Sequence, residues 1–352
     1  MPEQKHIVVL GAGVVGLTTA LELKQRIPTA AVVIAAKFFP GDRSIEYCSP
    51  WAGANWMSTA TDDGVQEAWD AETYARFGAL ADAVPEAGIT RMPIRAVFDR
   101  PREQAGVLSE GTGRIWYEEL VGGVGEIPGA ELPAGACFGF GFETFMVNTQ
   151  AYLAWLNVQC LKNNIEMRRA NFEDIRQVFH DLPADAYFNC TGLGSRHLKG
   201  VEDTDLYPTR GQVMLVETPK SSRPMKKMYF RSPRRVDNDT TYIFPRYPSG
   251  GVILGGCRVD NDWNGEVDLE FAEDIKRRCC ALAPELGLPE GLKVVYHAVG
   301  LRPSRKGGSR VEPETIDGKL VIHNYGAGGT GYQSSWGTAK HAVDHFMKRT
   351  GS

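Results

Sequence analysis

Residues 7–16 read Ile-Val-Val-Leu-Gly-Ala-Gly-Val-Val-Gly, an apolar run that enters three glycines and continues into an apolar helical segment. This order of strand, glycine turn and helix is typical of the first βαβ unit of a dinucleotide-binding fold. We expect Gly11 to make the tight turn, Gly13 to let the backbone approach a phosphate, and Gly16 to let the helix pack closely on the strand. The positive end of the helix dipole suits an anion. The sequence therefore predicts a cofactor pyrophosphate at this turn.

The composition indicates an intracellular protein that acts on small molecules. The 352 residues are long for one hydrophobic core, so two lobes are expected, and 43% hydrophobic with 23% charged is ordinary for an enzyme. A net charge of −4 gives no basic footprint for nucleic acid, and no run of about 18 apolar residues is present to span a membrane. Seven cysteines without a CxxC pair or a secretory signal favour a reducing compartment.

Two further glycine clusters, at 192–194 and 326–331, also follow apolar strands, and the segments between the clusters alternate like antiparallel strands. A cofactor lobe that is interrupted by a second lobe explains this order. We predict an α/β chain of two lobes in an α+β arrangement: a discontinuous Rossmann-like FAD-binding lobe (1–60, 146–205 and 300–352) and a substrate lobe with an antiparallel mixed sheet (61–145 and 206–299). Two-lobed flavoproteins are built in this way.

The second strand, predicted over 31–36, ends where a dinucleotide fold usually presents an acidic residue to the ribose, about 20 residues after the glycines. Ala35, Ala36 and Lys37 occupy that stretch. The missing acid weakens the alternative of a nicotinamide-dependent dehydrogenase. It leaves ribose or adenine contacts to the backbone or to Lys37, which can also be explained as a solvated strand end.

Two other runs are candidates for ligand contacts. Residues 49–56, Ser-Pro-Trp-Ala-Gly-Ala-Asn-Trp, form a loop of small residues that lies flat against a planar ligand or packs as an Ω-loop. Residues 299–305, Val-Gly-Leu-Arg-Pro-Ser-Arg, follow a strand predicted over 293–297. Arg302 at that strand end either binds a carboxylate with its planar fork or belongs to a surface turn.

No metal site is expected. His341 and His345 stand one turn apart on a helix predicted over 335–348, but no third ligand is evident. The apparatus of hydrolases and disulfide exchange is also missing from the sequence. A basic segment between the predicted strands is either a solvated loop or a lid that attracts anionic substrates; its cations are Lys220, Arg223, Lys226, Lys227, Arg231, Arg234 and Arg235.

Over nearly its whole length, the chain resembles the D-amino-acid oxidase and D-aspartate oxidase family, and among its members the fungal D-amino-acid oxidases. The resemblance rests on VVLGAGVVGLTTA at 8–20, SPWAGANW at 49–56, NCTGLGS at 189–195, RGQVMLVE at 210–217, YIFPR at 242–246, VGLRPSR at 299–305 and YGAGGTGYQSSWG at 325–337. It implies non-covalent FAD, hydride transfer from a D-amino acid, and products that are a 2-oxo acid, ammonia and hydrogen peroxide from oxygen. It also implies a homodimer.

The resemblance implies roles for individual residues. Arg302 and Tyr242 pair with the substrate carboxylate, Tyr229 supplies a lid tyrosine, the backbone carbonyl of Gly329 takes the substrate amine, and Gln333 lies nearby. The FAD contacts that carry over are Gly11, Ala12, Gly13, Val14, Val15, Gly16, Lys37, Ser44, Ala52, Gly53, Ala54, Asn55, Asn171, Thr191, Gly192, Arg302, Gly328, Gly329, Thr330, Gly331, Tyr332 and Gln333.

The substrate side chain is the open question. At the position of Arg258, D-aspartate oxidases resemble this chain in carrying an arginine, whereas family members with neutral substrates carry an aromatic residue. It either binds a second carboxylate or pairs with Asp260 or Asp262 and leaves the pocket open to neutral side chains. Oxidation of a broad range of D-amino acids is the main prediction. D-Aspartate selectivity and a flavin-binding protein without turnover are the alternatives. The resemblance implies a peroxisomal location, although residues 349–352 do not carry the family's Ser-Lys-Leu signal.

Overall fold

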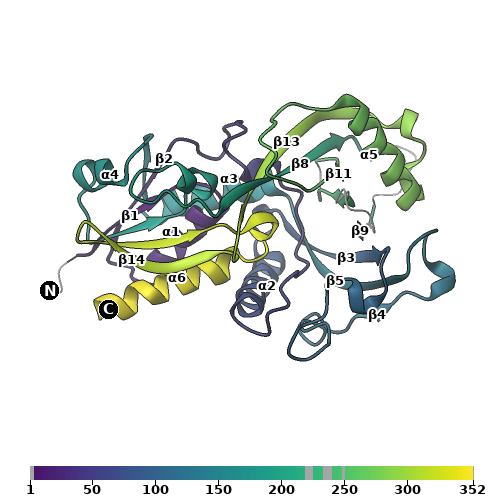
Figure 1. The fold of residues 1–352 in the computed structure, drawn as a ribbon, viewed down its shortest axis with the longest axis horizontal. Helices are drawn as coiled ribbons and strands as arrows, with labels where there is room; N and C mark the ends of the chain where they lie inside the picture. Colours follow the sequence, from purple (N-terminus) through teal and green to yellow (C-terminus); the bar gives the residue numbers. More distant parts are fainter. Residues whose placement is uncertain (1–3, 219–224, 233–239, 248–249, 352) are drawn as a thin grey trace. The chain divides into compact units, whose positions relative to one another are not determined.

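The computed structural model describes residues 4–218, 225–232, 240–247 and 250–351. The chain divides into two compact units (Figure 1). Unit 1 comprises Met1–Pro50, Gln150–Pro208 and Arg302–Ser352, and unit 2 comprises Trp51–Thr149 and Thr209–Leu301. The chain therefore leaves unit 1 and returns to it twice.

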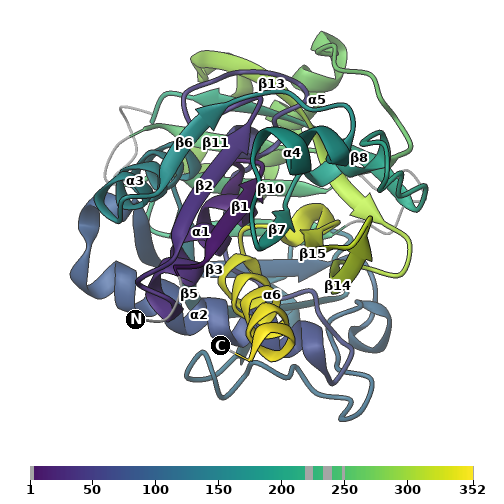
Figure 2. The same ribbon diagram turned by 90° about the vertical axis from the view of Figure 1, so that its left-hand side faces the viewer.

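Unit 1 is built on a six-stranded sheet with the strand order β14-β15-β7-β1-β2-β6 (Figure 2). The strands from β15 to β6 are parallel, and β14 pairs antiparallel with β15. Their bounds are β1 (His6–Leu10), β2 (Ala31–Ala36), β6 (Glu166–Arg169), β7 (Ala186–Asn189), β14 (Arg310–Ile316) and β15 (Lys319–Tyr325). Because β1 has β2 on one side and β7 on the other, the point where the strand order reverses lies at β1, and ligands of open α/β sheets bind at such points.

Helices flank this sheet. They are α1 (Val14–Arg26), α3 (Thr149–Lys162), α4 (Ile175–Asp181) and α6 (Ser335–Thr350). Helices α1 and α6 contact each other, and α6 also contacts β14 and β15 (Figure 2). The central strands are apolar, as expected where both faces of a sheet are covered: β1 is buried from Ile7 onward, and β7 is buried along its whole length.

Unit 2 is built on a mixed sheet with the strand order β12-β8-β11-β10-β9-β3-β5-β4, and β13 also pairs with β8. Most pairs are antiparallel, but β3 and β9 are parallel. The bounds are β3 (Ile89–Phe98), β4 (Gly125–Glu126), β5 (Phe138–Val147), β8 (Leu206–Val216), β9 (Met228–Ser232), β10 (Thr241–Pro245), β11 (Val252–Gly255), β12 (Val259–Asp260) and β13 (Val294–Arg305). The mixed α/β architecture predicted from the sequence is confirmed.

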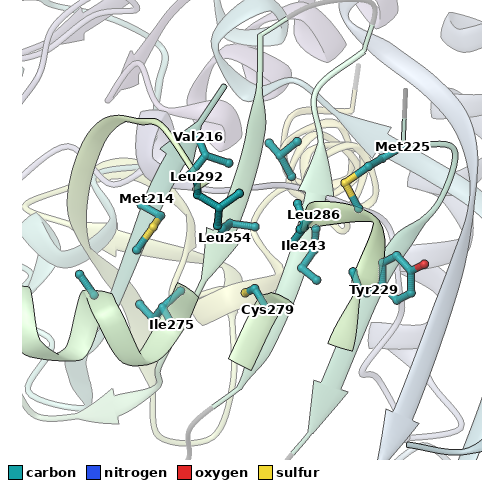
Figure 3. Packing of buried hydrophobic residues seen from close by; sticks show 13 residues of the cluster. Met214, Val216, Met225, Tyr229, Ile243, Leu254, Ile275, Cys279, Leu286 and Leu292 are labelled. Atoms are coloured by element: carbon teal, nitrogen blue, oxygen red, sulfur yellow. The ribbon is translucent and has the colours of Figure 1, made fainter. Parts of the chain in front are cut away.

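Helices α2 (Val65–Ala83) and α5 (Leu269–Leu282) belong to unit 2. Helix α5 begins at an N-cap, Asp268, whose carboxylate accepts a hydrogen bond from the Phe271 amide at 2.9 Å. Its apolar stripe, which includes Ile275 and Cys279, packs on one face of the sheet to form the cluster in Figure 3. This packing fixes which sheet residues point toward α5 and which point to the opposite face.

The largest difference from the predicted lobe boundaries lies at residues 51–60, and the other lobe boundaries shift by two to four residues. Residues 51–60 belong to unit 2, because the amides of Ala54 and Trp56 donate to the carbonyls of Val147 and Phe145 at 2.9 Å each, which adds this segment to β5. Residues 299–305 lie within β13 and do not follow it. No helix in the described part of the chain is long and apolar enough to cross a membrane.

Candidate active site

The glycine turn in unit 1 is dictated by close backbone contacts. Gly11 has φ of +100°, and a Cβ atom there would lie 2.5 Å from the carbonyl oxygen of Cys190 at the end of β7. A Cβ atom at Gly16 would lie 2.0 Å from the carbonyl oxygen of Gly11. Larger residues therefore cannot occupy either position without moving backbone. The turn lies at the point of the sheet where ligands are expected.

The N-terminus of α1 suits an anion. Its N-cap, Gly13, has no side chain to cap the helix, and the first turn, which includes Val14 and Val15, contains no acidic residue. Two residues that the sequence analysis missed hold this turn. Ser49 Oγ accepts from the Val14 amide at 3.1 Å, and the Tyr47 hydroxyl donates to the Ala12 carbonyl at 2.7 Å. No local pattern marks them, because both partners are more than thirty positions away.

The end of β2 carries cations whose partners come from the following loop. Lys37 Nζ lies 2.6 Å from Glu46 Oε2, and both side chains are exposed. Arg169, the last residue of the neighbouring strand β6, donates to the carboxylate of Asp42 at 2.6 Å and to the Lys37 carbonyl at 2.9 Å. The hydrogen bond from Arg169 holds the pKa of Asp42 below its usual value. Predicted contacts Ser44 and Asn171 also lie here: Ser44 Oγ accepts from the Glu46 amide, and Asn171 is exposed two residues after β6.

A buried polar network supports the turn after β7. Thr191 donates its hydroxyl to Asn189 Oδ1 at 2.8 Å, and Gly192 follows with φ of +58°. Asn189 Nδ2 contacts His323 Nδ1 at 3.3 Å, and His323 Nε2 lies 2.8 Å from Glu314 Oε2. An amide NH2 only donates, so His323 Nδ1 accepts and its Nε2–H donates to Glu314. Burial lowers the pKa of His323 to about 4.

The third glycine cluster lies beside β13. Ala327 forms a bridge with Ser304, and a Cβ atom at Gly328 would lie 3.1 Å from Ser304 Oγ. Arg302, two residues earlier in β13, is half-buried near Cys48, where burial raises the thiol pKa to about 11 and the charge of Arg302 opposes that rise. Arg302 therefore lies on the same strand as Ser304, two residues before the point where that strand contacts this cluster.

The other predicted residues of this cluster lie directly after Gly328 in the sequence. The backbone of Gly329 is exposed, and the Thr330 hydroxyl donates to the Ala327 carbonyl at 2.7 Å. Gly331 ends the short turn Gly328–Thr330, Tyr332 donates its hydroxyl to the Ser49 carbonyl at 2.8 Å, and Gln333 is buried. Tyr332 thereby connects this cluster to the loop that caps α1.

In unit 2, Tyr242 lies on the face of the sheet opposite α5. It stacks on Phe244, with ring centroids 5.1 Å apart. Its ring lies over two glycines, since a Cβ atom at Gly255 would be 2.2 Å from its Cζ atom and one at Gly256 would be 2.8 Å from its hydroxyl. These two glycines make the space that the Tyr242 phenol occupies.

The Ala52–Asn55 segment lies on the same face. Gly53 lies so close to Phe244 that a Cβ atom would be 2.4 Å from the ring. Asn55 Nδ2 is buried and has no hydrogen-bond partner among the residues that the structure describes. A buried amide donor without a partner is rare in native structures and needs an explanation, and a bound ligand with an acceptor atom supplies one.

The structure corrects the assignment of Tyr229. It pairs across the strands with Ile243, whereas Tyr242 pairs with Phe230. Directly opposite residues share a face, so Tyr229 points toward α5, where it lies at the edge of the hydrophobic cluster (Figure 3). Its hydroxyl makes a short hydrogen bond to Glu285. Phe230 is therefore the residue of β9 that shares the Tyr242 face.

Arg258 is exposed and follows the two glycines under Tyr242. The acids considered as its partners have other contacts: Asp260 accepts from Thr209, and Asp262 lies 3.7 Å from Arg210. Of the basic segment, Lys226 and Lys227 are exposed and Arg231 pairs with Asp99 at 2.9 Å. Its other members, Lys220, Arg223, Arg234 and Arg235, lie outside the described residues.

The described residues contain no cluster of three or more potential metal ligands. His341 and His345 stack on each other along α6 with ring centroids 4.7 Å apart. All seven cysteines are free thiols; Cys279 is buried in the core of unit 2, and Cys280 is half-buried.

Comparison with known proteins decides the family. The family model described as FAD dependent oxidoreductase matches residues 6–345. The chain belongs to this family. FAD is accordingly its cofactor, and the alternative of a nicotinamide-dependent dehydrogenase is set aside. In unit 1, the glycine turn and the first turn of α1, which carries no acidic residue, fit the phosphates of a bound dinucleotide.

Curated relatives match this family member over nearly its full length. A Schizosaccharomyces pombe protein named D-amino-acid oxidase is 39% identical over 348 residues, which covers 96% of this chain and 95% of that protein. A D-amino-acid oxidase of Fusarium vanettenii is 36% identical, with coverage of 96% and 95%. A D-aspartate oxidase of Talaromyces thermophilus is 32% identical, with coverage of 96% and 94%.

Solved structures share the fold. Glycine oxidase from Geobacillus kaustophilus has a TM-score of 0.75 at 17% identity and covers 98% of this chain and 95% of its own. L-alpha-glycerophosphate oxidase from Mycoplasma pneumoniae, solved with FAD bound, has a TM-score of 0.68 at 13% identity, with coverage of 97% and 94%. At these identities, the likeness is one of fold.

Proposed function

We propose that this flavoprotein oxidises D-amino acids to 2-oxo acids and ammonia, with oxygen as the final acceptor. The observation that carries the proposal is the full-length match to two proteins named D-amino-acid oxidase, at 39% and 36% identity. The substrate loses its Cα hydrogen with two electrons, and the resulting imino acid hydrolyses. When bound, FAD would supply the two-electron acceptor for that hydride, with oxygen as the final acceptor and hydrogen peroxide as its product.

The residues of this chain would bind and orient the substrate. Arg302 offers a planar fork for the α-carboxylate, and Tyr242 offers a hydroxyl that is held over Gly255 and Gly256. The exposed backbone of Gly329 offers a carbonyl to the substrate amine. No general acid or base is assigned, because orientation alone lowers a barrier by about 7–11 kcal/mol in well-aligned intramolecular reactions.

The experiment that tests this function is anaerobic mixing of the purified yellow protein with D-alanine, D-aspartate and their L-enantiomers. We expect the flavin absorbance to bleach with the D-enantiomers only. A protein that keeps its flavin absorbance with all four compounds would contradict the proposal and favour flavin binding without turnover. Arg302→Lys should slow bleaching strongly while FAD remains bound, since an ammonium cannot bind a carboxylate at two points.

A second candidate is selectivity for acidic D-amino acids, as in the relatives named D-aspartate oxidase. The observation that favours it is Arg258, an exposed cation that follows Gly255 and Gly256, the two glycines beneath the Tyr242 ring. Arg258→Ala should lower kcat/KM for D-aspartate about tenfold or more and leave D-alanine within about twofold. An equal effect on both substrates would exclude this role. Arg277→Ala, on the exposed face of α5, is the control.

Assembly and location follow the family resemblance only. The proposal includes a homodimer, which light scattering after size-exclusion chromatography would test. It also includes a peroxisomal location within the cell, which fluorescence microscopy of the tagged protein would test.

A further inference from the structure

Arg246, the last residue of the YIFPR run, has a buried charged side chain without an acidic partner. It is only 5% exposed, and in the described part of the chain no carboxylate lies within ion-pair distance of its guanidinium. Its Nε atom is buried and has no hydrogen-bond partner. Burying an unpaired charge is costly, so neutral oxygens must offset that cost.

The neutral oxygens around the Arg246 guanidinium are two side-chain hydroxyls and one backbone carbonyl. Arg246 Nη2 donates to Thr149 Oγ1 at 3.2 Å and to the Ala52 carbonyl at 3.5 Å, and its Nη1 donates to the Tyr296 hydroxyl at 3.3 Å. Thr149 in turn donates its hydroxyl to the same Ala52 carbonyl at 3.0 Å. The Arg246 guanidinium and the Thr149 hydroxyl therefore both donate to the Ala52 carbonyl. A planar fork can reach three oxygens in this way, but a lysine ammonium cannot.

Ala52 begins the segment that ends at the unpartnered Asn55 amide. The middle of the segment is fixed by two backbone hydrogen bonds between Ala54 and Val147, each 2.9 Å long. At its start, the Ala52 carbonyl accepts from Arg246 and from Thr149. Asn55 itself bridges to Met146, and the next amide, of Trp56, donates to the Phe145 carbonyl at 2.9 Å. Arg246 and Thr149 therefore complete at Ala52 the anchoring of a segment whose other end is paired with β5.

We propose that Arg246 is a positioning residue for FAD: together with Thr149 it fixes the Ala52–Asn55 segment so that the Asn55 amide meets an acceptor of the bound cofactor. The inference rests on the FAD dependence of the family and not on the D-amino-acid substrate. It assigns no contact between Arg246 and FAD. Arg246 acts through the segment.

The test measures the dissociation constant of FAD from the purified holoenzyme, by the flavin fluorescence that appears on dilution. Arg246→Lys should raise this constant about tenfold, because charge-assisted hydrogen bonds are lost. Thr149→Val should raise it about three- to tenfold, whereas Thr149→Ser, which keeps the hydroxyl, should stay within about twofold of the unaltered protein. Arg277→Lys, an exposed arginine of α5, is the control.

A double-mutant cycle separates positioning from general destabilisation. If Arg246 acts through Asn55, Arg246→Lys should have less than about half of its effect, in free energy, when Asn55→Ala is already present. Additive effects, or an unchanged FAD dissociation constant in folded variants, would overturn the inference. If Arg246→Lys does not fold, the pair Thr149→Val and Thr149→Ser decides. None of these readouts depends on turnover, so failure of the proposed function remains distinguishable.

Discussion

Successive residues of a strand point to opposite faces of the sheet, and the residues near Tyr242 show that this alternation decides which of them can take part in the site. Tyr229 and Phe230 are neighbours in β9, and only the cross-strand register places Phe230 beside Tyr242 and Tyr229 beside Ile243. Phe230 also contacts Phe98, with ring centroids 6.2 Å apart. The face around Tyr242 is therefore aromatic on its β9 side, and the Tyr229 hydroxyl is engaged by Glu285 on the other face.

This alternation predicts opposite phenotypes for two similar substitutions. Tyr229→Phe removes a hydrogen bond to a carboxylate and should lower the free energy of unfolding by about 1–2 kcal/mol, with kcat/KM for D-alanine within about twofold. Tyr242→Phe should lower kcat/KM about tenfold or more, because it removes a hydroxyl from the proposed carboxylate site. Urea unfolding and steady-state kinetics measure the two effects. A loss of kcat/KM in Tyr229→Phe equal to that of Tyr242→Phe would restore Tyr229 to the site.

Residue roles that depend on neighbours close in the sequence could be predicted, whereas roles that depend on partners far away in the sequence could not. Gly11 and Gly16 were identifiable because their turn, phosphate and helix-packing roles are local to one βαβ unit. Tyr229 was misassigned because a one-residue change of register exchanges the faces of a strand, and sequence alone did not fix the register. Tyr47 and Ser49 were missed because their partners, Ala12 and Val14, precede β2.

At the scale of elements, β7, β14 and β15 share one buried network. His323 of β15 connects Asn189 of β7 to Glu314 of β14, and Glu314 also accepts from Arg310 at 3.0 Å. The network stands directly behind Thr191, a predicted FAD contact. Protonation of His323 Nδ1 would place an N–H against the Asn189 amide hydrogens, in agreement with the low pKa of the imidazole.

This network predicts acid sensitivity. The pKa of His323 falls from 6.5 to about 4 in the folded protein, because burial and then the charge of Arg310 disfavour the imidazolium. The unfolded chain therefore binds more protons between these values, and stability is present above pH 6.5 and is lost as the pH falls toward 4. The loss is about 3 kcal/mol for a pKa change of this size.

Urea unfolding of the unaltered protein and His323→Gln across this pH range measures the effect. Other histidines with lowered pKa values, His297, His341 and His345, contribute to both proteins, so the difference between them isolates His323. The variant should be less stable at neutral pH and should lose less stability on acidification. Parallel curves for His323→Gln would contradict the assignment.

Whole elements were predictable where their periodicity is strong. The helix predicted over 335–348 agrees with α6, because its buried apolar residues Ala342, Val343 and Phe346 recur at helical spacing. Strand β13 was expected to end before Gly300 and Pro303, residues that usually interrupt a strand. It continues to Arg305 because Gly300 lies under Trp51, where a Cβ atom would be 3.1 Å from that side chain. A close approach of this kind between distant segments leaves no local signal.

At the scale of the whole molecule, unit 1 is complete only when the last segment of the chain has joined it. Unit 1 takes its strands from three separate segments, and β15 and α6 come from the last of them. The glycine clusters at 11–16, 192–194 and 326–331 lie on those three segments. If all three clusters hold FAD, as the family resemblance implies, FAD would bind only when residues far apart in the sequence have assembled, and its binding would report on the folded state of the entire unit.

This dependence predicts that FAD stabilises the folded protein by mass action. A ligand that binds only the folded state adds about 2.7 kcal/mol at a concentration of one hundred times its dissociation constant. The Tm of the protein stripped of flavin should therefore rise with each addition of FAD, by several degrees at saturation, and differential scanning calorimetry should show this rise. NAD at the same concentrations is the control, because the end of β2 offers Ala36 where a nicotinamide enzyme presents an acid to the ribose. A Tm that rises equally with NAD, or that does not respond to FAD, would contradict an FAD site built from these three segments.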